Sequence, residues 1–285
     1  MSGARALHSL LSMSDRLPRA TDPEGLLPTD HAPGARIGDY IVERRVPALG
    51  IGFHYEAIHV VLPRRVEIKV MPAGTPLALA LIREACIIES LVHPGIPRVY
   101  ECGILADRQR WVANELVTGM TLATLADRGE VSVVDAADLL NHVATILAHA
   151  HARGLVHGNV GPTAIVIPDQ PRATPVMLVD WGTAPDLRLG TPGDPRADIR
   201  ALGVVASELL GAEAPPLAFA ELVRRMIDPD PAQRPTASYV AERARWLVRQ
   251  VAVEIAIPEP IDATTEQHII VSRRIASVRP PTAPS

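Results

Sequence analysis

The sequence has 285 residues, of which 47% are hydrophobic, so it can bury a core of ordinary size. Its net charge is −4 with both signs interspersed, which argues against nucleic-acid binding. No apolar run is long enough to cross a bilayer, and the first residues lack the layout of a signal peptide. We therefore expect a cytoplasmic protein without a membrane span.

Residues 1–116 favour a leader followed by a small sheet. Residues 1–36 are rich in Pro, Gly, Ser and charge, and we expect them to be flexible. The predicted strands span residues 40–42, 53–61, 66–71, 98–103 and 111–116. Between the third and fourth strands, Leu81, Ala85 and Ile88 follow Leu77 at helical spacing, which predicts a helix over residues 75–91.

The remainder of the chain favours helices. Ser132 is followed three residues later by Asp135, the pattern of a capping box, and apolar residues then recur at helical spacing up to Gly154. Further helices are predicted from Asp198 onward, and over residues 222–227 and 237–251. The stretch Gln267–Ile275 (QHIIVSRRI) is strand-like, and would pair either with a partner's sheet or with this protein's own domain.

The basic residues are distributed unusually. Of the 28, only one is a lysine, Lys69, in Val66-Glu67-Ile68-Lys69. An ammonium and a guanidinium are not interchangeable in a tight ion-pair site, so this lysine indicates such a site. The alternative interpretation is a leftover surface lysine.

Several short motifs occur in a definite order. Beside the strand with Lys69, the chain has His157-Gly158-Asn159, then four residues, then Ala164, and later Asp180-Trp181-Gly182. The run Ala152–His157, the helix start at Asp198 and the loop with Arg234-Pro235 complete the set. In this order and spacing the chain resembles the bacterial, eukaryotic-like Ser/Thr protein kinases.

The resemblance covers residues 37–252 and implies a two-lobed α+β fold. Residues 37–118 would form an N-lobe with a five-stranded antiparallel sheet and the helix αC, and residues 119–252 a mainly helical C-lobe. Too few residues separate Gly182 from Asp198, and Leu210 from Leu222, for a full activation segment and the helix αG. The leader 1–36 and the tail 253–285 flank the domain.

Two replacements affect the chemistry that the resemblance implies. Asn159 stands where the family has the aspartate that accepts the substrate proton, and a neutral amide cannot act as that base. Ala164 stands where the family has an asparagine ligand of Mg²⁺, and a methyl group cannot bind a metal that needs oxygen ligands. Asp180 would either bind one Mg²⁺ or act as a structural hydrogen-bonding group.

The nucleotide-binding residues are expected to be remnants. Lys69 matches the lysine that contacts ATP phosphates and pairs with a glutamate of the helix αC. Glu84 has the matching spacing, and Glu89 is a rival partner. Gly52 and Glu115 are further remnants of the nucleotide site.

The adenine pocket of the family would be altered. Pro47 and Leu49 replace glycines of the phosphate-binding loop, which argues against a phosphate cradle. His54 and Glu67 occupy positions that sandwich adenine, and Asn114 occupies an ordinarily apolar position. We expect His54 and Glu67 to pair and fill the pocket, unless both extend into solvent.

Four residues are assigned fold-holding roles by the resemblance. His157 and Trp181 would be packing residues, and Asp198 would cap the backbone of the loop around His157. Arg234 lacks the glutamate that it pairs with in the family, so it would need another acid or face water.

These features predict a pseudokinase that acts as a regulatory or scaffolding module in signalling and binds another protein. No resident cofactor is expected, and ATP with Mg²⁺ would bind weakly. The alternative is a weak or atypical ATP-dependent Ser/Thr kinase or small-molecule phosphotransferase. It is based on Gly193-Asp194-Pro195 and on a resemblance of residues 157–202 to aminoglycoside and choline kinases.

Overall fold

The computed structural model describes residues 30–46, 52–129, 131–181, 193–209 and 215–256. These residues form two compact units. The first holds the described residues up to Val92 together with Pro97–Leu116, and the second holds His93–Ile96, Val117–Trp181 and the described residues after Pro192. The expectations for the leader, for Pro47 and Leu49, for the activation segment and for the tail lie wholly or largely outside the described residues.

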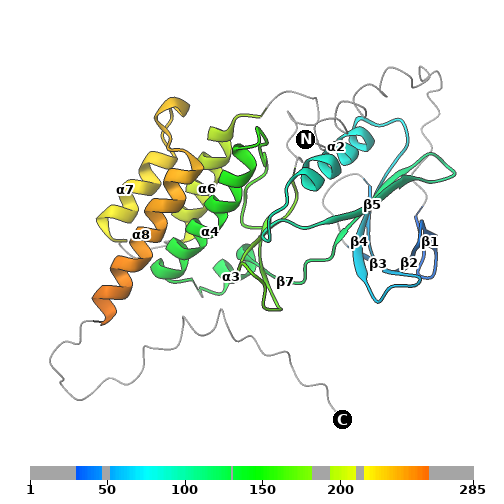
Figure 1. The fold of residues 1–285 in the computed structure, drawn as a ribbon, viewed down its shortest axis with the longest axis horizontal. Coiled ribbons are helices and arrows are strands. Elements are labelled where there is room, and N and C mark those ends of the chain that lie inside the picture. The colour runs from blue at the N-terminus through cyan, green and yellow to red at the C-terminus, as the bar shows by residue number, and fades with distance from the viewer. Residues whose placement is uncertain (1–29, 47–51, 130, 182–192, 210–214, 257–285) are drawn as a thin grey trace, which may run out of the picture. The chain divides into compact units, whose positions relative to one another are not determined.

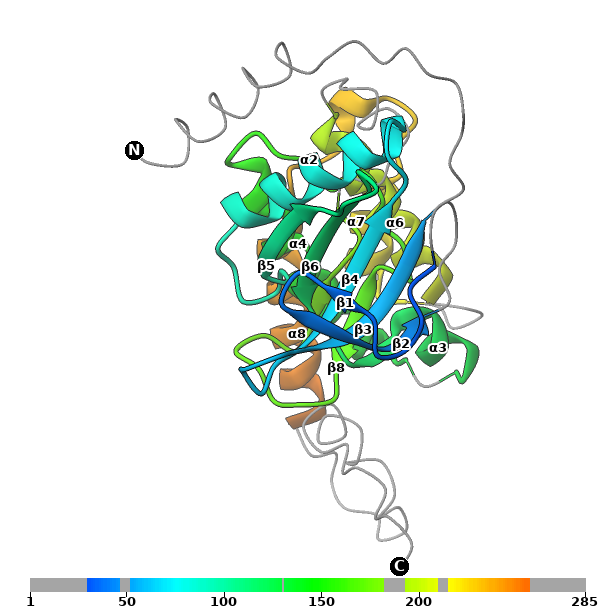
Figure 2. The same cartoon turned by 90° about the vertical axis from the view of Figure 1, so that its right-hand side faces the viewer.

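The first unit is built on an antiparallel sheet with the strand order β1-β2-β3-β4-β6-β5 (Figures 1 and 2). Its strands are β1 (Arg36–Ile37), β2 (Tyr40–Val46), β3 (Phe53–His59), β4 (Arg65–Met71), β5 (Val99–Ile104) and β6 (Arg110–Glu115). The five predicted strands are all present. In this sheet the described residues add one strand to the prediction, β1, which has two residues and is too short to leave an alternating pattern.

Alternation along the strands places the core of this unit on one face of the sheet. Tyr55, Ile68 and Trp111 belong to a cluster of buried side chains on that face. Gly38, with a φ of 56°, lies so close to Trp111 that an added Cβ would be 2.5 Å from its ring. The turn between β1 and β2 therefore requires a glycine for both its backbone conformation and its packing.

The helix α2 (Pro76–Ser90) lies on the other face, beside β5 and β6 (Figure 2). It begins with Thr75, whose side chain accepts a hydrogen bond from the Ala78 N–H, and with a proline in its first turn. Leu81 and Ala85 pack on Val112 of β6, as their helical spacing predicts. The predicted helix is thus confirmed.

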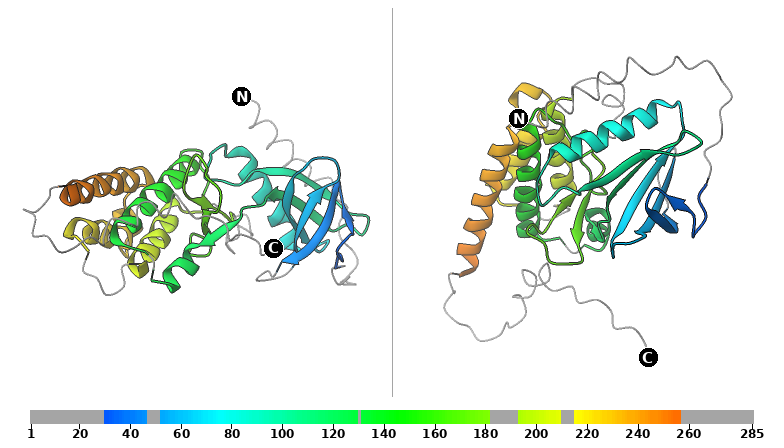
Figure 3. Two further views of the ribbon diagram at one scale, coloured as in Figure 1. Left: turned by 90° about the horizontal axis from the view of Figure 1, so that it is seen from below. Right: turned by 45° about the vertical axis from the view of Figure 1, so that its right-hand side comes forward.

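The second unit contains a bundle of helices and a small sheet (Figures 1 and 3). The helices are α3 (Leu122–Asp127), α4 (Val133–His151), α6 (Pro195–Leu209), α7 (Leu217–Met226) and α8 (Ala237–Ala256), and the strands are β7 (Gly119–Thr121), β8 (Ile165–Pro168) and β9 (Met177–Leu178). Helices α4 and α8 lie side by side. The capping box at Ser132 and Asp135 is confirmed.

The turn after α2 belongs to the second unit through backbone packing. Gly95 accepts a hydrogen bond from the Leu178 N–H at 2.8 Å. A Cβ at Gly95 would lie 2.5 Å from the Ile146 side chain on α4, so no larger residue fits without a shift.

Among the described residues, no helix combines the length and apolar character that a membrane span requires.

Candidate functional site

The lone lysine of the chain lies in a buried ion pair within the first unit. Lys69 Nζ on β4 is 3.1 Å from Glu84 Oε1 on α2, and their side chains are 6% and 8% exposed. This confirms the predicted partner, Glu84, and not its rival Glu89. Because a buried charge is costly without a counter-charge, the pair fixes α2 on the sheet.

A second polar pair occupies the same face of the sheet. His54 Nδ1 on β3 is 3.1 Å from Glu67 Oε1 on β4, which confirms the predicted pairing. Burial opposes ionisation of Glu67, but the Lys69 ammonium and the hydrogen bond with His54 outweigh it and hold the pKa of this carboxyl below its ordinary value. Glu67 is therefore a carboxylate near neutral pH.

The remaining nucleotide-site positions of the first unit have different surroundings. Asn114 is 5% exposed, and its Oδ1 has no hydrogen-bond partner among the described residues. Glu115 accepts a hydrogen bond from the Arg98 N–H. Gly52 has a φ of 113°, and a Cβ there would lie 2.8 Å from the Val70 carbonyl oxygen. None of these contacts tests whether Asn114, Glu115 and Gly52 bind a nucleotide, so these roles stay predictions.

In the second unit, one carboxylate organises the loop that contains His157. Asp198, at the start of α6, accepts hydrogen bonds from the His157 N–H at 2.9 Å and the Gly158 N–H at 2.8 Å. The predicted capping role is confirmed. His151 Nε2 on α4 also lies 2.8 Å from this carboxylate. Nothing in the sequence indicates the role of His151, since its spacing from Asp198 carries no recognisable pattern.

The His157 side chain is fully buried and its tautomer follows from its partners. Its Nδ1 accepts from the Asn159 N–H at 3.1 Å, so Nε2 carries the proton and donates to the Val179 carbonyl at 2.9 Å. Burial lowers the pKa of His157, against the raising effect of Asp198. The buried Trp181 ring lies 4.5 Å from the imidazole, centroid to centroid, so both residues pack as predicted.

The three positions expected to carry the chemistry lie next to this scaffold. Asn159 is exposed, whereas Ala164 is 1% exposed. The Ala164 carbonyl accepts a hydrogen bond from the Val179 N–H at 2.9 Å, which places position 164 beside the segment leading to Asp180. Asp180 has a left-handed backbone with a φ of 61°, a conformation that is uncommon for residues other than glycine but that aspartate adopts more readily than most.

Arg234 differs from both expectations made for it. It is 8% exposed, and its guanidinium donates to the backbone carbonyls of Asp228, Arg196 and Pro229 at 2.8, 3.1 and 3.3 Å. It therefore ties the loop before α8 to the start of α6 through carbonyl oxygens. Every residue carries a carbonyl group, so the sequence does not indicate such partners, and only another acid or water was expected.

Comparison with known proteins gives the class of this fold. No protein-family model matches the chain. The structure superposes on the crystal structure of the PknI kinase domain of Mycobacterium tuberculosis with a TM-score of 0.61 and 25% identity, over 78% of this chain and all of that one. The fold is that of a protein kinase domain, with a curled antiparallel sheet in one part and helices in the other.

Sequence relatives point the same way. The chain is 30% identical over 209 residues to the Ser/Thr protein kinase PknA of M. tuberculosis, covering 62% of this chain and 48% of PknA. It is 31% identical over 201 residues to PknI of the same organism, covering 65% of this chain and 34% of PknI. The chain thus spans half the length of these relatives or less. The similarity supports a relationship to the bacterial Ser/Thr protein kinases.

Proposed function

We propose that this chain is a catalytically impaired protein kinase homologue that serves as a protein-binding module in signalling. The main observation behind the proposal is a contrast, in the segment of residues 157–164, between retained structural contacts and replaced chemical groups. The capping contacts of Asp198 and the packing of His157 are intact, whereas the neighbouring positions 159 and 164 hold an amide and a methyl group. Loss of a general base alone costs about 10²- to 10⁴-fold in rate.

Metal binding would be weakened for a related reason. Magnesium needs oxygen ligands in a nearly octahedral arrangement. Ala164, beside the segment that leads to Asp180, supplies no side-chain oxygen. Asp180 alone would hold Mg²⁺ mainly through water and through the nucleotide's own phosphates.

The first unit supports the same proposal. The pair His54–Glu67 places polar groups where the family has an apolar adenine slot. Asn114, which lies opposite Glu67 in the register of β4 and β6, adds a buried polar side chain. An adenine ring would have to displace or desolvate these groups, which costs free energy. The Lys69–Glu84 pair is also the arrangement that the family uses at its nucleotide site, and we assign it a structural role here because positions 159 and 164 lack the base and the metal ligand.

A surface of the second unit has the composition of a protein interface. Tyr239, Arg243 and Trp246 recur at helical spacing on α8, and the two aromatic side chains are both 41% exposed. The Arg243 guanidinium lies 4.0 Å from the Trp246 ring centroid. Tyr, Arg and Trp are the residues most enriched in interface hot spots, so this stripe favours a binding function.

The first experiment measures thermal unfolding with and without ATP at several Mg²⁺ concentrations. A ligand at about 100 times its Kd adds roughly 2.7 kcal/mol and shifts Tm by a few degrees. We expect no such shift. A clear shift that disappears in Lys69→Ala would instead favour the second candidate, an atypical phosphotransferase that uses the buried lysine.

A second experiment tests catalysis directly through transfer of phosphate from ATP to the protein itself and to a generic protein substrate. We expect no transfer above the blank. Transfer that is lost in Asp180→Asn, but retained in the matched exposed control Asp127→Asn, would overturn the proposal.

A further inference from the structure

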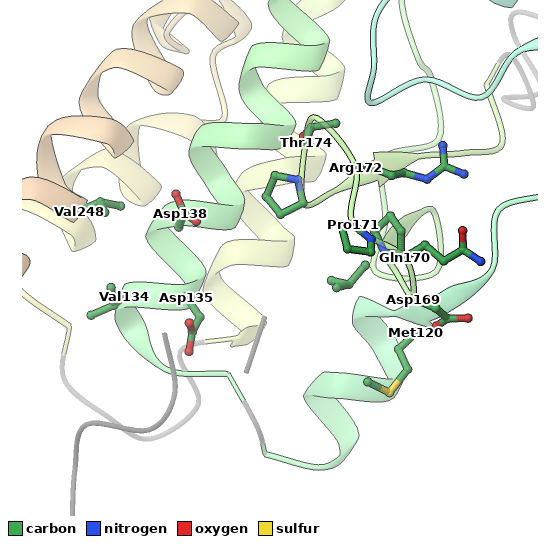
Figure 4. A pocket seen from close by; sticks show the side chains of 13 residues that line it. Met120, Val134, Asp135, Asp138, Asp169, Gln170, Pro171, Arg172, Thr174 and Val248 are labelled. Carbon is green, nitrogen blue, oxygen red and sulfur yellow. The ribbon is translucent and has the colours of Figure 1, made fainter. Parts of the chain in front are cut away.

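A groove of about 520 Å³ opens on the second unit, lined by none of the residues of the kinase-like site (Figure 4). It is bordered by α4, by the ends of β7 and β8, by the loop of residues 169–175 and by α8. Met120, Val134, Ile167 and Val248 give it an apolar lining. An apolar groove of this size accommodates a short peptide segment better than it accommodates bulk water.

The groove is also acidic. Three of its lining residues are carboxylates, Asp135, Asp138 and Asp169, and one is a guanidinium, Arg172. Asp135 is engaged in the capping box of α4, and Asp138 Oδ1 lies 3.5 Å from His142 Nε2, but the Asp138 side chain is still 40% exposed and Asp169 is exposed in the loop. In Figure 4 the Arg172 side chain extends away from α4, and its Nη1 lies 3.9 Å from Met177 Sδ. An occupant would therefore combine apolar side chains with positive charge.

We propose that this groove is the docking site of the chain's own segment Gln267–Ile275. That segment joins Ile269, Ile270 and Val271 to the adjacent Arg273 and Arg274. The apolar residues match the floor of the groove, and the arginines match Asp138 and Asp169. Charge complementarity of this kind fixes orientation as well as partner.

The position of α8 makes the docking geometrically simple. Val248, which lines the groove, lies eight residues before Ala256, the last described residue. At the rise of an α-helix, the C-terminal end of α8 therefore lies about 12 Å beyond Val248. The residues from 257 to Gln267 span at most about 35 Å when extended, which is ample for the chain to turn back.

The tether lowers the affinity that docking requires. A segment joined by a short linker experiences an effective concentration in about the millimolar range, so modest contacts hold it in place. The linker itself carries Glu259, Asp262 and Glu266, which an acidic groove repels. The charge pattern thus selects the segment after Glu266, and leaves the linker outside the groove.

Hydrogen exchange of the full chain, followed by mass spectrometry, tests the proposal. We expect the amides of residues 267–275 to exchange about tenfold more slowly than an unstructured peptide of the same sequence, which corresponds to docking about nine-tenths of the time. Asp138→Arg with Asp169→Arg should remove the protection. Arg273→Asp with Arg274→Asp should do the same without any change inside the folded units, and combining all four substitutions should restore it.

Matched controls separate docking from general charge effects. Asp127→Arg, an exposed acid outside the groove, and Arg279→Glu, outside the segment, should leave protection unchanged. Protection that is absent in the natural sequence, or that persists when Asp138 and Asp169 are reversed, would overturn the proposal. Protection that rises over an about hundredfold range of protein concentration would show docking on a second copy, and would also overturn it.

Discussion

Lys69 in the first unit and Asp198 in the second are both buried charged groups, but they are stabilised in different ways. Lys69 pairs with another side chain, Glu84, whereas Asp198 accepts hydrogen bonds mainly from the backbone of a loop. The first arrangement depends on two residues that must both be present. The second depends on one residue, because every loop backbone offers N–H groups. Each holds its unit together whether or not phosphate is transferred.

The largest effect that tests this comparison should follow removal of one partner in the first unit. Glu84→Ala leaves the Lys69 ammonium in a site that is almost closed to water, where the Glu67 carboxylate offsets only part of the lost counter-charge, and we expect a loss of stability of about 3–4 kcal/mol. Replacement of both residues, Lys69→Met with Glu84→Leu, should recover most of that loss. Urea unfolding monitored by tryptophan fluorescence measures both. Equal losses in the single and double variants would contradict a purely structural role.

In the second unit a single substitution should suffice. Asp198→Ala leaves the His157 and Gly158 N–H groups without their acceptor, and we expect a loss of about 3 kcal/mol. Asn159→Ala, in the same loop but exposed, should change stability by less than about 0.5 kcal/mol. A large effect of Asn159→Ala would mean that this amide has a structural task of its own.

The two units should also respond to acid at different pH. The folded pKa of His157 lies below its ordinary value of 6.5, so the unfolded chain takes up this proton first. The stability contributed by neutral His157 is complete above pH 6.5 and falls by about 1.4 kcal/mol per pH unit below it. The contribution of Glu67, whose pKa is lowered from 4.5, is lost only at pH values below 4.5.

Comparison of the natural protein with His157→Gln, by denaturant unfolding between pH 7.5 and pH 5, isolates the histidine. The difference in stability between the two proteins should shrink as the pH falls. A difference that stays constant over this range would show that His157 is not responsible.

The smallest effect concerns Asn114 on β6. Its buried Oδ1 lacks a hydrogen-bond partner among the described residues. Asn114→Leu removes this unsatisfied group and should stabilise the first unit by about 1 kcal/mol. The same thermal unfolding assay applies. A loss of stability would indicate that the amide has a partner outside the described residues.

The sequence predicted the long elements of the fold because their hydrophobic period is repeated several times. The face of α2 with Leu81 and Ala85, and the buried face of α4, are examples. It missed the strands β1, β7, β8 and β9, of two to four residues each, and the six-residue α3, since elements of that length leave little or no period.

In the candidate site, too, some contacts were predictable from the sequence and others were not. The pairs Lys69–Glu84 and His54–Glu67 were predictable, because opposite charges or complementary groups at matching positions of a known order suggest a contact. The contact of His151 with Asp198 and the carbonyl partners of Arg234 were not. Backbone acceptors and tertiary neighbours carry no signature of residue type.

The unusual basic composition has a practical consequence for chemical labelling. Lys69 is the one side-chain primary amine in this sequence, and it is only 5% exposed. Amine-directed reagents such as acylating esters need access to the amine, which is buried against Glu84 while α2 lies on the sheet. The rate at which such a reagent modifies Lys69 would therefore measure how often the first unit opens locally around this residue, without any introduced probe.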